Sequence, residues 1–320
     1  MQRRKFITLL AGVTVTWPLP ALAQQPAMPV IAYLGVSDSD ASAFRQGLGE
    51  AGFVDGKSVL IEYRFTKDYS RMPDLAAELV HRHVAVIATA STQAALAAKT
   101  ATSTIPIVFA IGDDPVKFGL VAAINHPGGN ATGVNLVAID LEAKRMGTLR
   151  ELVPAIGTIG VLVNPKNPSA AKQSSDIQDA ARAVERQILI LNAEDEQEIE
   201  RAFATLVQQK IGALAVAGDT MFAARRIQIV TLAARYSIPT IYQRKEFAEV
   251  GGLISYGTDY SEMVRQQGLY VARILKGERP ADLPIMQSTR FELFINLKTA
   301  KALGLTVPQS LLVAADKVIE

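Results

Sequence analysis

The feature that most constrains the fold is an alternation that starts at Val30. Short apolar runs rich in β-branched residues alternate with amphipathic stretches of about 10 to 17 residues, which is typical of parallel sheets covered by helices. The runs form two sets of five, which predicts an α/β protein with two similar lobes. The first set of expected strands is Val30–Val36, Val59–Phe65, Val84–Ala90, Ile105–Ile111 and Ala131–Leu136. The second set is Thr158–Asn164, Gln187–Asn192, Ala213–Ala217, Thr240–Gln243 and Leu253–Tyr256.

The segments between and after the two sets predict how the lobes are joined. Asp140–Val153 has the pattern of a helix that is N-capped by Asp140. After the second set we expect a helix over Tyr260–Lys276, an extended piece over Leu283–Ile295, and a last helix over Leu297–Leu303 that ends at Gly304. The chain has no Ser/Gly/Pro-rich linker, so several chain crossings that act as a hinge are expected instead of a flexible tether.

The first 23 residues have the pattern of an export signal. Arg3, Arg4 and Lys5 form a basic head, Phe6–Trp17 is a short apolar stretch, and the small-x-small site Ala21–Ala23 predicts cleavage after Ala23. The apolar stretch is too short for a membrane helix. The paired arginines fit the twin-arginine route, but the general secretory route also accepts such a head, so both stay open.

Charge and cysteine content exclude several classes of protein. Without the signal, 30 basic residues (33 minus 3) face 31 acidic residues, a formal charge of −1. A near-neutral chain has no basic surface for phosphate backbones, so nucleic acid is not expected as a partner. The sequence has no cysteine, which excludes thiolate zinc sites and a lipid-anchored cysteine after the signal. We therefore expect a periplasmic protein that is free of the membrane.

The usual signals of cofactor binding and catalysis are weak or missing. The run Gly47–Gly52 fits the GxGxxG pattern, but it ends an expected helix instead of joining a strand to a helix start, as a dinucleotide site requires. The three histidines, His81, His83 and His126, have no carboxylate cluster around them and no triad context. We predict no cofactor, no metal and no enzymatic activity, although a dispersed active site stays open.

Polar residues follow the expected strands, where open parallel sheets bind their ligands. In the first half, Ser91 and Thr92 begin a helix and offer hydroxyls and free amides to an anion, or act only as a helix cap. Further along, Asp114 and Pro115 look like the start of a helix, which leaves Asp113 as a spare carboxylate for a ligand amine. A solvated turn is the alternative for Asp113.

The second half has polar segments at the equivalent places, Asn164–Pro168 and Gly218–Thr220. The two lobes are therefore expected to point helix N-termini at one another across a cleft that holds a polar ligand. Tyr33, Tyr242 and Tyr256 are candidates to cover an apolar or aromatic part of that ligand. Each of them has a place in the core as its alternative.

Several blocks of sequence together resemble the family of ABC transporter substrate-binding proteins, whose better-known members capture tryptophan or related amino acids. The resemblance spans the chain after the signal. Its densest blocks are AFRQGL (43–48), IEYR (61–64), IPIVF (105–109) with DPV (114–116), PGGNATG (127–133), GGLISYG (251–257), ILKG (274–277) with PADLP (280–284), and NLKTAKALG (296–304).

The resemblance implies the type I periplasmic-binding-protein fold, with two doubly wound parallel-sheet lobes and a ligand cleft between them. It implies hinge crossings near Asn135, Tyr256 and Ser288, so that residues 28–134 plus 258–287 form lobe 1 and residues 136–255 plus 289–320 form lobe 2. The ligand contacts that it implies are Ser37, Ser91, Thr92, Asp113, Asn164, Asp219 and Tyr242.

The expected function is that of the periplasmic component of an ABC importer. The protein would bind a small organic solute, such as an amino acid or an aromatic compound, and close on it by hinge bending. It would then deliver the solute to an ABC permease with its ATPase at the inner membrane, as a monomer. Two alternatives stay open: a sensory module that reports the ligand to a membrane receptor, and a periplasmic enzyme of similar fold.

Overall fold

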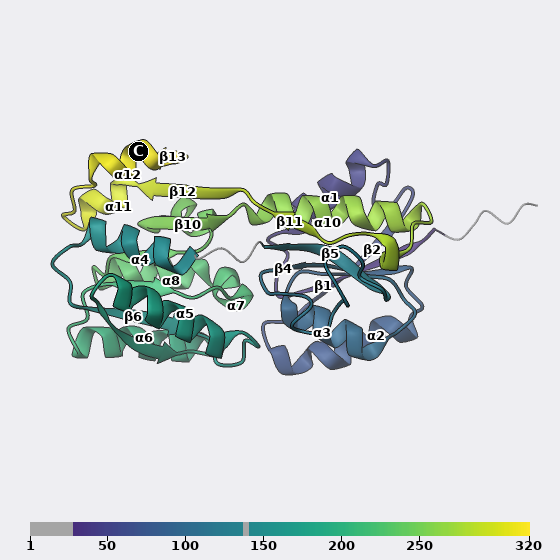
Figure 1. Cartoon of the computed structure of the whole chain (residues 1–320), viewed down its shortest axis with the longest axis horizontal. Coiled ribbons are helices and arrows are strands. Elements are labelled where there is room, and N and C mark those ends of the chain that lie inside the picture. Colours follow the sequence, from purple (N-terminus) through teal and green to yellow (C-terminus); the bar gives the residue numbers. More distant parts are fainter. Residues whose placement is uncertain (1–27, 137–140) are drawn as a thin grey trace, which may run out of the picture.

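The computed structural model describes residues 28–136 and 141–320 and has two α/β lobes side by side (Figure 1). The predicted export signal and the predicted N-cap Asp140 lie outside the described residues. Within the described ranges, none of the helices is both long enough and apolar enough to cross a membrane. The two-lobed α/β class is confirmed.

Both lobes alternate strands with helices. The elements of the first lobe are β1 (Val30–Gly35), α1 (Ala41–Glu50), β2 (Leu60–Phe65), η1 (Tyr69–Arg71), α2 (Met72–His81), β3 (Val86–Thr89), α3 (Thr92–Ala101), β4 (Ile107–Ile111), β5 (Ala131–Leu136), α10 (Tyr260–Leu275), η2 (Pro280–Asp282) and β11 (Met286–Ser288). Those of the second lobe are α4 (Leu141–Leu152), β6 (Thr158–Val163), α5 (Ala170–Ala183), β7 (Gln187–Asn192), α6 (Glu196–Gln208), β8 (Leu214–Val216), α7 (Thr220–Ala224), α8 (Arg226–Arg235), β9 (Thr240–Tyr242), α9 (Lys245–Glu249), β10 (Ile254–Thr258), β12 (Phe291–Asn296), α11 (Leu297–Ala302), α12 (Gln309–Ala314) and β13 (Lys317–Ile319).

The first lobe is built on a six-stranded parallel sheet in the order β11-β5-β4-β3-β1-β2. Its central strands are buried on both faces, so they contain continuous apolar runs such as Ile107–Ile111. Helices α1 and α10 cover one face and α2 and α3 cover the other, as Figure 1 shows. Strands β3 and β4 are parallel neighbours in this sheet, so their carboxyl ends lie next to each other. These ends are on the side of the second lobe.

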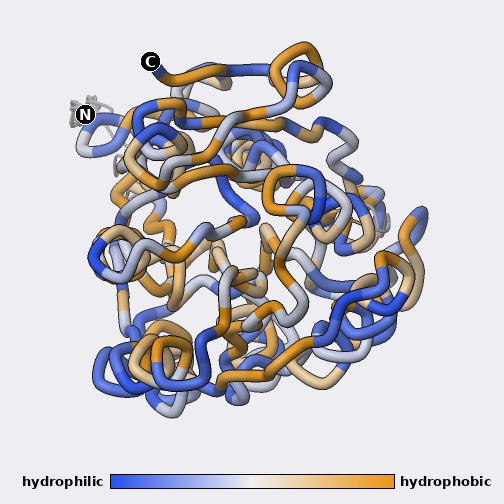
Figure 2. Tube along the Cα trace, turned by 90° about the vertical axis from the view of Figure 1, so that its left-hand side faces the viewer, coloured by the Kyte–Doolittle hydropathy of each residue, from blue (hydrophilic) through white to orange (hydrophobic). Residues whose placement is uncertain are grey.

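The second lobe has a seven-stranded sheet in the order β13-β12-β10-β9-β8-β6-β7. Strands β6 to β10 are parallel, whereas β12 runs antiparallel to β10. Helices α4, α5, α11 and α12 pack on one face, and α6 to α9 pack on the other. In Figure 2 the helices at the rim alternate between hydrophobic and hydrophilic residues, because each buries one side against the sheet.

The GxGxxG run lies at the end of α1, as its position predicts, and its first glycine, Gly47, packs against α10. A Cβ on Gly47 would lie 1.9 Å from the backbone oxygen of Arg265 and 3.2 Å from the Cα of Gly268, both in α10. Gly52 follows the end of α1 with a φ of +92°, the left-handed conformation that ends many helices. The run therefore joins two helices tightly and does not approach a cofactor.

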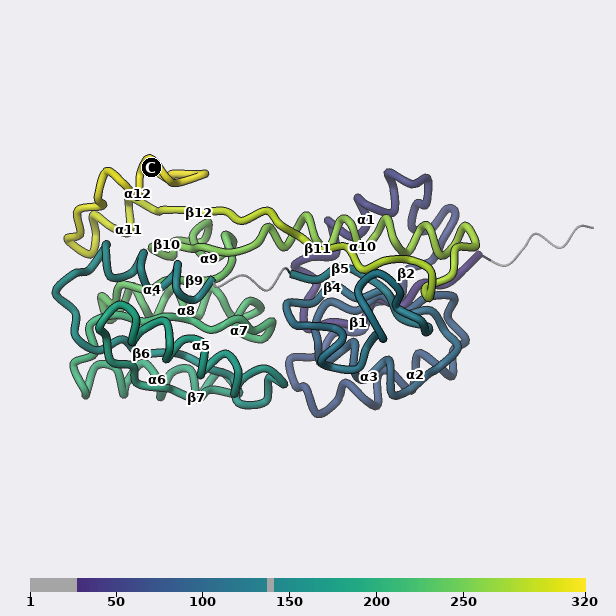
Figure 3. Tube along the Cα trace, viewed as in Figure 1, coloured from purple at the N-terminus to yellow at the C-terminus, as the bar shows by residue number. Residues whose placement is uncertain are grey.

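The chain passes between the two sheets three times: from β5 to α4, from β10 to α10, and from β11 to β12. Figure 3 shows the last two connections running together between the lobes. Asn135 and Ser288 lie in the last strands of the first sheet before their crossings. Tyr256 instead lies within β10, paired with Leu293, and Thr258 still belongs to the second sheet. The second crossing therefore comes about Asp259, after the position expected from the sequence.

The C-terminal region departs from the sequence expectation. The chain does not stop at a helix ending near Gly304 but adds α12 and the short edge strand β13, which pairs with β12. A six-residue helix behind Pro308 and a three-residue strand are too short to produce a hydrophobic period. The predicted extended piece also divides into two strands, β11 and β12, which belong to different sheets.

Candidate functional site

A cavity of about 1100 Å³ lies between the two lobes. We call it the interlobe cavity. It is bordered by the carboxyl ends of strands from both sheets and by the helices that follow them, as the alternation of strands and helices predicts. Its polar lining includes Ser91, Thr92, Gln93 and Asp113 from the first lobe and Glu142, Asn167, Ser169, Gln173, Asp219, Gln243, Arg244 and Thr258 from the second. The exposed ion pair of Lys172 and Asp176 also lines the cavity.

The N-terminus of α3 borders the cavity from the first lobe. Ser91 is buried and caps the helix, since its Oγ accepts a hydrogen bond of 3.1 Å from the amide of Ala94. The amides of Thr92 and Gln93 precede the first hydrogen-bonded turn and carry the positive end of the helix dipole. This corner is suited to a carboxylate or another anion.

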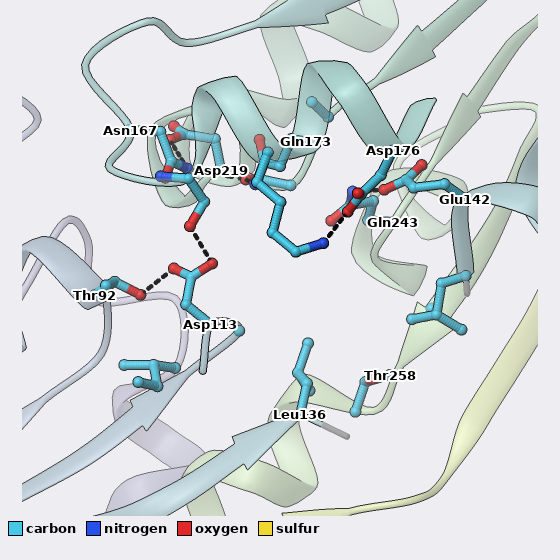
Figure 4. A pocket seen from close by; sticks show the side chains of 18 of the residues that line it. Thr92, Asp113, Leu136, Glu142, Asn167, Gln173, Asp176, Asp219, Gln243 and Thr258 are labelled. Carbon is cyan, nitrogen blue, oxygen red and sulfur yellow. Dashed lines mark hydrogen bonds and ion pairs between the residues drawn. The ribbon is translucent and has the colours of Figure 1, made fainter. Parts of the chain in front are cut away.

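Asp113 is not the spare carboxylate that the sequence predicts. Its Oδ2 accepts a 2.5 Å hydrogen bond from the Thr92 hydroxyl, and its Oδ1 accepts one from the hydroxyl of Ser169 in the second lobe. Figure 4 shows Thr92 beside Asp113. A carboxylate has about four lone-pair positions, so Asp113 can still accept from a ligand. Asp114 caps a turn through the amides of Val116 and Lys117, but no helix follows it.

Asp219 follows β8 and is the most densely hydrogen-bonded carboxylate of the cavity. It caps α7 through the amide of Met221 and accepts bonds from Asn164 and Asn167, at 3.3 and 2.9 Å. From the first lobe, the hydroxyl of Tyr69 lies 3.0 and 3.1 Å from its two oxygens. Burial raises the pKa of Asp219 above its ordinary value, although these hydrogen bonds act in the opposite direction.

Arg244, just after β9, connects the lobes near the crossings. Its Nη2 lies 2.7 Å from Oδ1 of Asp40 in the first lobe, and its guanidinium lies 4.0 Å from the ring centroid of Tyr260. Glu246 binds the same guanidinium from within the second lobe at 3.1 Å. Burial lowers the pKa of Arg244, but the charges of Asp40 and Glu246 outweigh burial and raise it overall. The cation therefore stays charged in this low-dielectric place.

A second polar group borders the cavity on the second lobe. Gln243 donates to Glu142 at 3.3 Å, and Glu142 also pairs with the buried Arg145. Two glycines hold Gln243 closely: a Cβ on Gly218 would lie 2.0 Å from its Oε1, and a Cβ on Gly257 would lie 1.8 Å from its backbone oxygen. Larger residues at either position would displace this side chain or its backbone.

Three of the seven predicted ligand contacts do not border the cavity. Tyr242 is 1% exposed and stacks on Phe247 in the core, and Ser37 hydrogen-bonds Ser39 at the surface of the first lobe. Asn164 is buried behind Asp219 and acts on it through the 3.3 Å bond. Tyr33 is also a core residue. For Tyr33 and Tyr242 the alternative prediction, a place in the core, is therefore the correct one. Both tyrosines lie in strands that are covered on both faces, where side chains pack into the core.

Eight polar residues that line or border the cavity were not predicted from the sequence: Tyr69, Gln93, Glu142, Ser169, Gln173, Gln243, Arg244 and Thr258. Gln243 and Arg244 follow a predicted strand, so the rule that placed Asp113 and Asp219 also applies to them. Tyr69 lies in the short helix η1, and its role depends on the approach of the other lobe, which no local pattern shows.

In this structure the lobes lie in contact across the cleft. The pairs that join them, each with one residue from either lobe, include Tyr69 with Asp219, Asp113 with Ser169, and Asp40 with Arg244. Each of these pairs includes at least one residue that lines the interlobe cavity, which is only partly enclosed. Among residues 28–136 and 141–320, no group of His, Asp and Glu side chains is arranged to hold a metal ion.

Two sheets whose strand ends face one another across a shared cavity define a binding protein of the type I periplasmic-binding-protein class. The sequence profile of the family described as ABC transporter substrate binding protein matches residues 35–319. The chain therefore belongs to this family. It is 27% identical over 270 residues to a tyrosine-binding protein of Clostridioides difficile (strain R20291), an alignment that covers 84% of this chain and 77% of the relative.

Solved structures of similar proteins have the same fold. A domain from Streptococcus pneumoniae in complex with L-Trp has a TM-score of 0.79 at 25% identity, covering 91% of this chain and 100% of that one. A conserved domain protein from Vibrio cholerae has a TM-score of 0.82 at 26% identity, with coverages of 91% and 99%. The ligand-free, open structure of a substrate binding protein from Clostridium difficile reaches 0.62 at 26% identity, with the same coverages. At nearly equal identity, the TM-score is higher with the L-Trp complex than with the ligand-free, open structure.

Proposed function

We propose that this protein captures a small organic solute in the interlobe cavity and delivers it to an ABC permease with its ATPase at the inner membrane. The observation that carries the proposal is that residues of both lobes line the cavity and that the lobes pair beside it, Asp113 with Ser169 and Tyr69 with Asp219. A solute that contacts both lobes stabilises their closed arrangement, and closure is a signal that a permease can recognise.

We propose an amino acid, in particular an aromatic one, as the solute. The relatives described as tyrosine-binding and as bound to L-Trp support this class. In the cavity, the N-terminus of α3 at Ser91 and Thr92 suits the carboxylate, and Asp113 suits the ammonium group. Phe118, Leu136 and other apolar side chains in the lining offer contacts to a ring.

Asn164 and Asp219 enter this proposal as positioning residues. The oxygens of Asp219 already accept hydrogen bonds from Tyr69, Asn167 and the amide of Met221. The role of Asp219 in this proposal is therefore to stabilise the closed arrangement of the lobes. We further propose that the lobes move as units about the three crossings, with Asn135 and Ser288 as hinge residues and the second hinge at Asp259.

Thermal unfolding with candidate solutes tests the binding proposal. A ligand that binds only the folded protein at 100 times its Kd stabilises it by about 2.7 kcal/mol, which is readily measured as a rise in Tm. We expect tyrosine, tryptophan or phenylalanine to raise the Tm more than leucine, a nucleoside or a sugar. No rise with any amino acid or aromatic acid would contradict the proposal.

Transport needs a separate test in cells. Deletion of the gene should abolish high-affinity uptake of the solute identified in vitro, and the wild-type gene should restore uptake. A binding-deficient variant at Asp113 should be exported normally but fail to restore uptake. Uptake that is unchanged by the deletion would favour a sensory role.

The predicted export signal has its own test. N-terminal sequencing of the protein from the periplasmic fraction should begin at Gln24, as expected for cleavage after Ala23.

A further inference from the structure

A set of polar side chains from the second lobe lines the interlobe cavity, whereas the proposed carboxylate and ammonium contacts come from the first lobe. It consists of Glu142, Gln173, Gln243 and Thr258, and we call it the distal polar cluster. Figure 4 shows Glu142, Gln243 and Thr258 on one side of the cavity, and Thr92 and Asp113 on the other.

Two members of this cluster have buried polar atoms without a partner. Thr258 is 8% exposed, and its Oγ1 makes no hydrogen bond within the described residues. The side-chain amide of Gln173 donates through Nε2 to the backbone oxygen of Gly218 at 2.8 Å, which leaves its Oε1 buried and without a donor among residues 28–136 and 141–320. Buried polar atoms in native proteins almost always have a partner, and both of these side chains line the cavity.

The neighbours of Thr258 and Gln173 determine the chemistry of the missing partner. Glu142 is already neutralised by Arg145 and also accepts from Gln243, so no unpaired negative charge remains here for a cation. Gln173 Oε1 is an acceptor, and the Thr258 hydroxyl can either donate or accept. A neutral hydroxyl or N–H group can donate to the Gln173 oxygen or share a hydrogen bond with the Thr258 hydroxyl, so it suits either atom.

We propose that the distal polar cluster is a second recognition subsite, which binds a neutral hydroxyl or N–H group at the end of the solute remote from its charged groups. This inference rests on the proposed function, since it assumes that the solute occupies the interlobe cavity. Gly218 and Gly257 support the subsite because a Cβ at either position would collide with Gln243. A site that hydrogen-bonds a ligand group rejects analogues without that group, because its own polar atoms then stay unpaired.

Matched pairs of solutes that differ by a single hydroxyl test the inference. Calorimetry should show that the wild-type protein binds tyrosine at least about ten times more tightly than phenylalanine, and 4-hydroxyphenylacetate more tightly than phenylacetate. Thr258→Val, which keeps the shape of the side chain and removes the hydroxyl, should reduce the ratio within each pair to about two. Gln173→Met should have a similar effect and serves as the second variant if Thr258→Val folds poorly.

The matched control is Thr89→Val. Thr89 also has a buried hydroxyl without a hydrogen bond in the described part of the chain, but it lies in β3 and does not line the cavity. It should keep the wild-type ratio within each pair. Equal affinities of the wild type for both members, or ratios that neither cavity variant changes, would overturn the inference and leave the proposed function intact. If neither pair nor any other amino acid binds the wild type, both are overturned.

Discussion

The hydroxyl of Tyr69 in the first lobe lies 3.0 Å from Oδ1 and 3.1 Å from Oδ2 of Asp219 in the second lobe. Burial raises the pKa of Tyr69 well above its ordinary value, so the phenol stays protonated and acts as a donor. Asp219 is fixed in turn by Asn164, Asn167 and the amide of Met221. This contact exists only when the lobes are close together, so it stabilises the closed arrangement relative to an open one.

Tyr69→Phe should therefore weaken solute binding without preventing folding. A hydrogen bond to a charged group contributes about 1.5 to 3 kcal/mol, which corresponds to a rise in Kd of roughly 10- to 150-fold. Calorimetry with the identified solute measures the change. Tyr236→Phe is the control, since Tyr236 stacks on Phe203 within the second lobe and does not reach the first. An unchanged Kd for Tyr69→Phe would mean that the contact does not contribute to closure.

Asp113→Asn should weaken binding more strongly. The substitution removes the charge that would pair with a ligand ammonium group, and it replaces an acceptor of the Thr92 and Ser169 hydroxyls with an amide donor. We expect Kd to rise by at least about 100-fold, since bonds between charged groups are the strongest hydrogen bonds in proteins. Asp195→Asn, at the cap of α6 on the outside of the second lobe, should bind normally. Normal binding by Asp113→Asn would place the ammonium group elsewhere.

Glu246 should contribute to loss of stability in acid. Burial acts to raise the pKa of Glu246, but the charge and hydrogen bonds of Arg244 outweigh it, so the pKa lies below its ordinary value. A carboxyl with a lowered folded-state pKa stabilises the protein above its unfolded pKa, and this contribution is lost as the pH falls through the folded value. The Tm of the wild type should therefore fall between about pH 5 and pH 3 more steeply than that of Glu246→Gln. Parallel curves for the two proteins would contradict this assignment.

Gly257→Ala should disturb both the fold and the site. The new Cβ would lie 1.8 Å from the backbone oxygen of Gln243, so β9 or β10 must shift. We expect a lower Tm and weaker solute binding, because Gln243 belongs to the distal polar cluster. Gly147→Ala is the control: Gly147 lies inside α4 with no other atom within 4 Å of the new methyl group, and the exchange should stabilise the helix by about 1 kcal/mol. Equal melting temperatures for both variants would contradict the packing argument.

The fold could be predicted from the sequence because most strands have an apolar stretch bounded by polar turns, and buried ones such as β4 (Ile107–Ile111) are unbroken apolar runs. All ten expected strands exist, from β1 to β10, since a covered parallel sheet demands such runs. The elements that were missed, α12 and β13, are too short to carry a period. The shifted second crossing has a similar cause, since Tyr256 and Thr258 belong to one strand whose end is set by pairing with β12.

The candidate site was only partly predictable. Ser91, Thr92, Asp113 and Asp219 border the cavity because they follow strands, and sequence order alone determines that position. Tyr242 does not, because its side chain points into the core, and the sequence does not reveal the direction of the last residue of a short strand. Tyr69 and Ser169 could not be found, since their partners, Asp219 and Asp113, belong to the opposite lobe.

A crystal structure of the protein with a solute that has been verified by calorimetry tests the central claim most directly. The account predicts electron density for that solute in the interlobe cavity, with a charged end at Ser91, Thr92 and Asp113, and with the pair of Tyr69 and Asp219 still formed. Density for the solute outside this cavity, or lobes that stay apart in the complex, would contradict it.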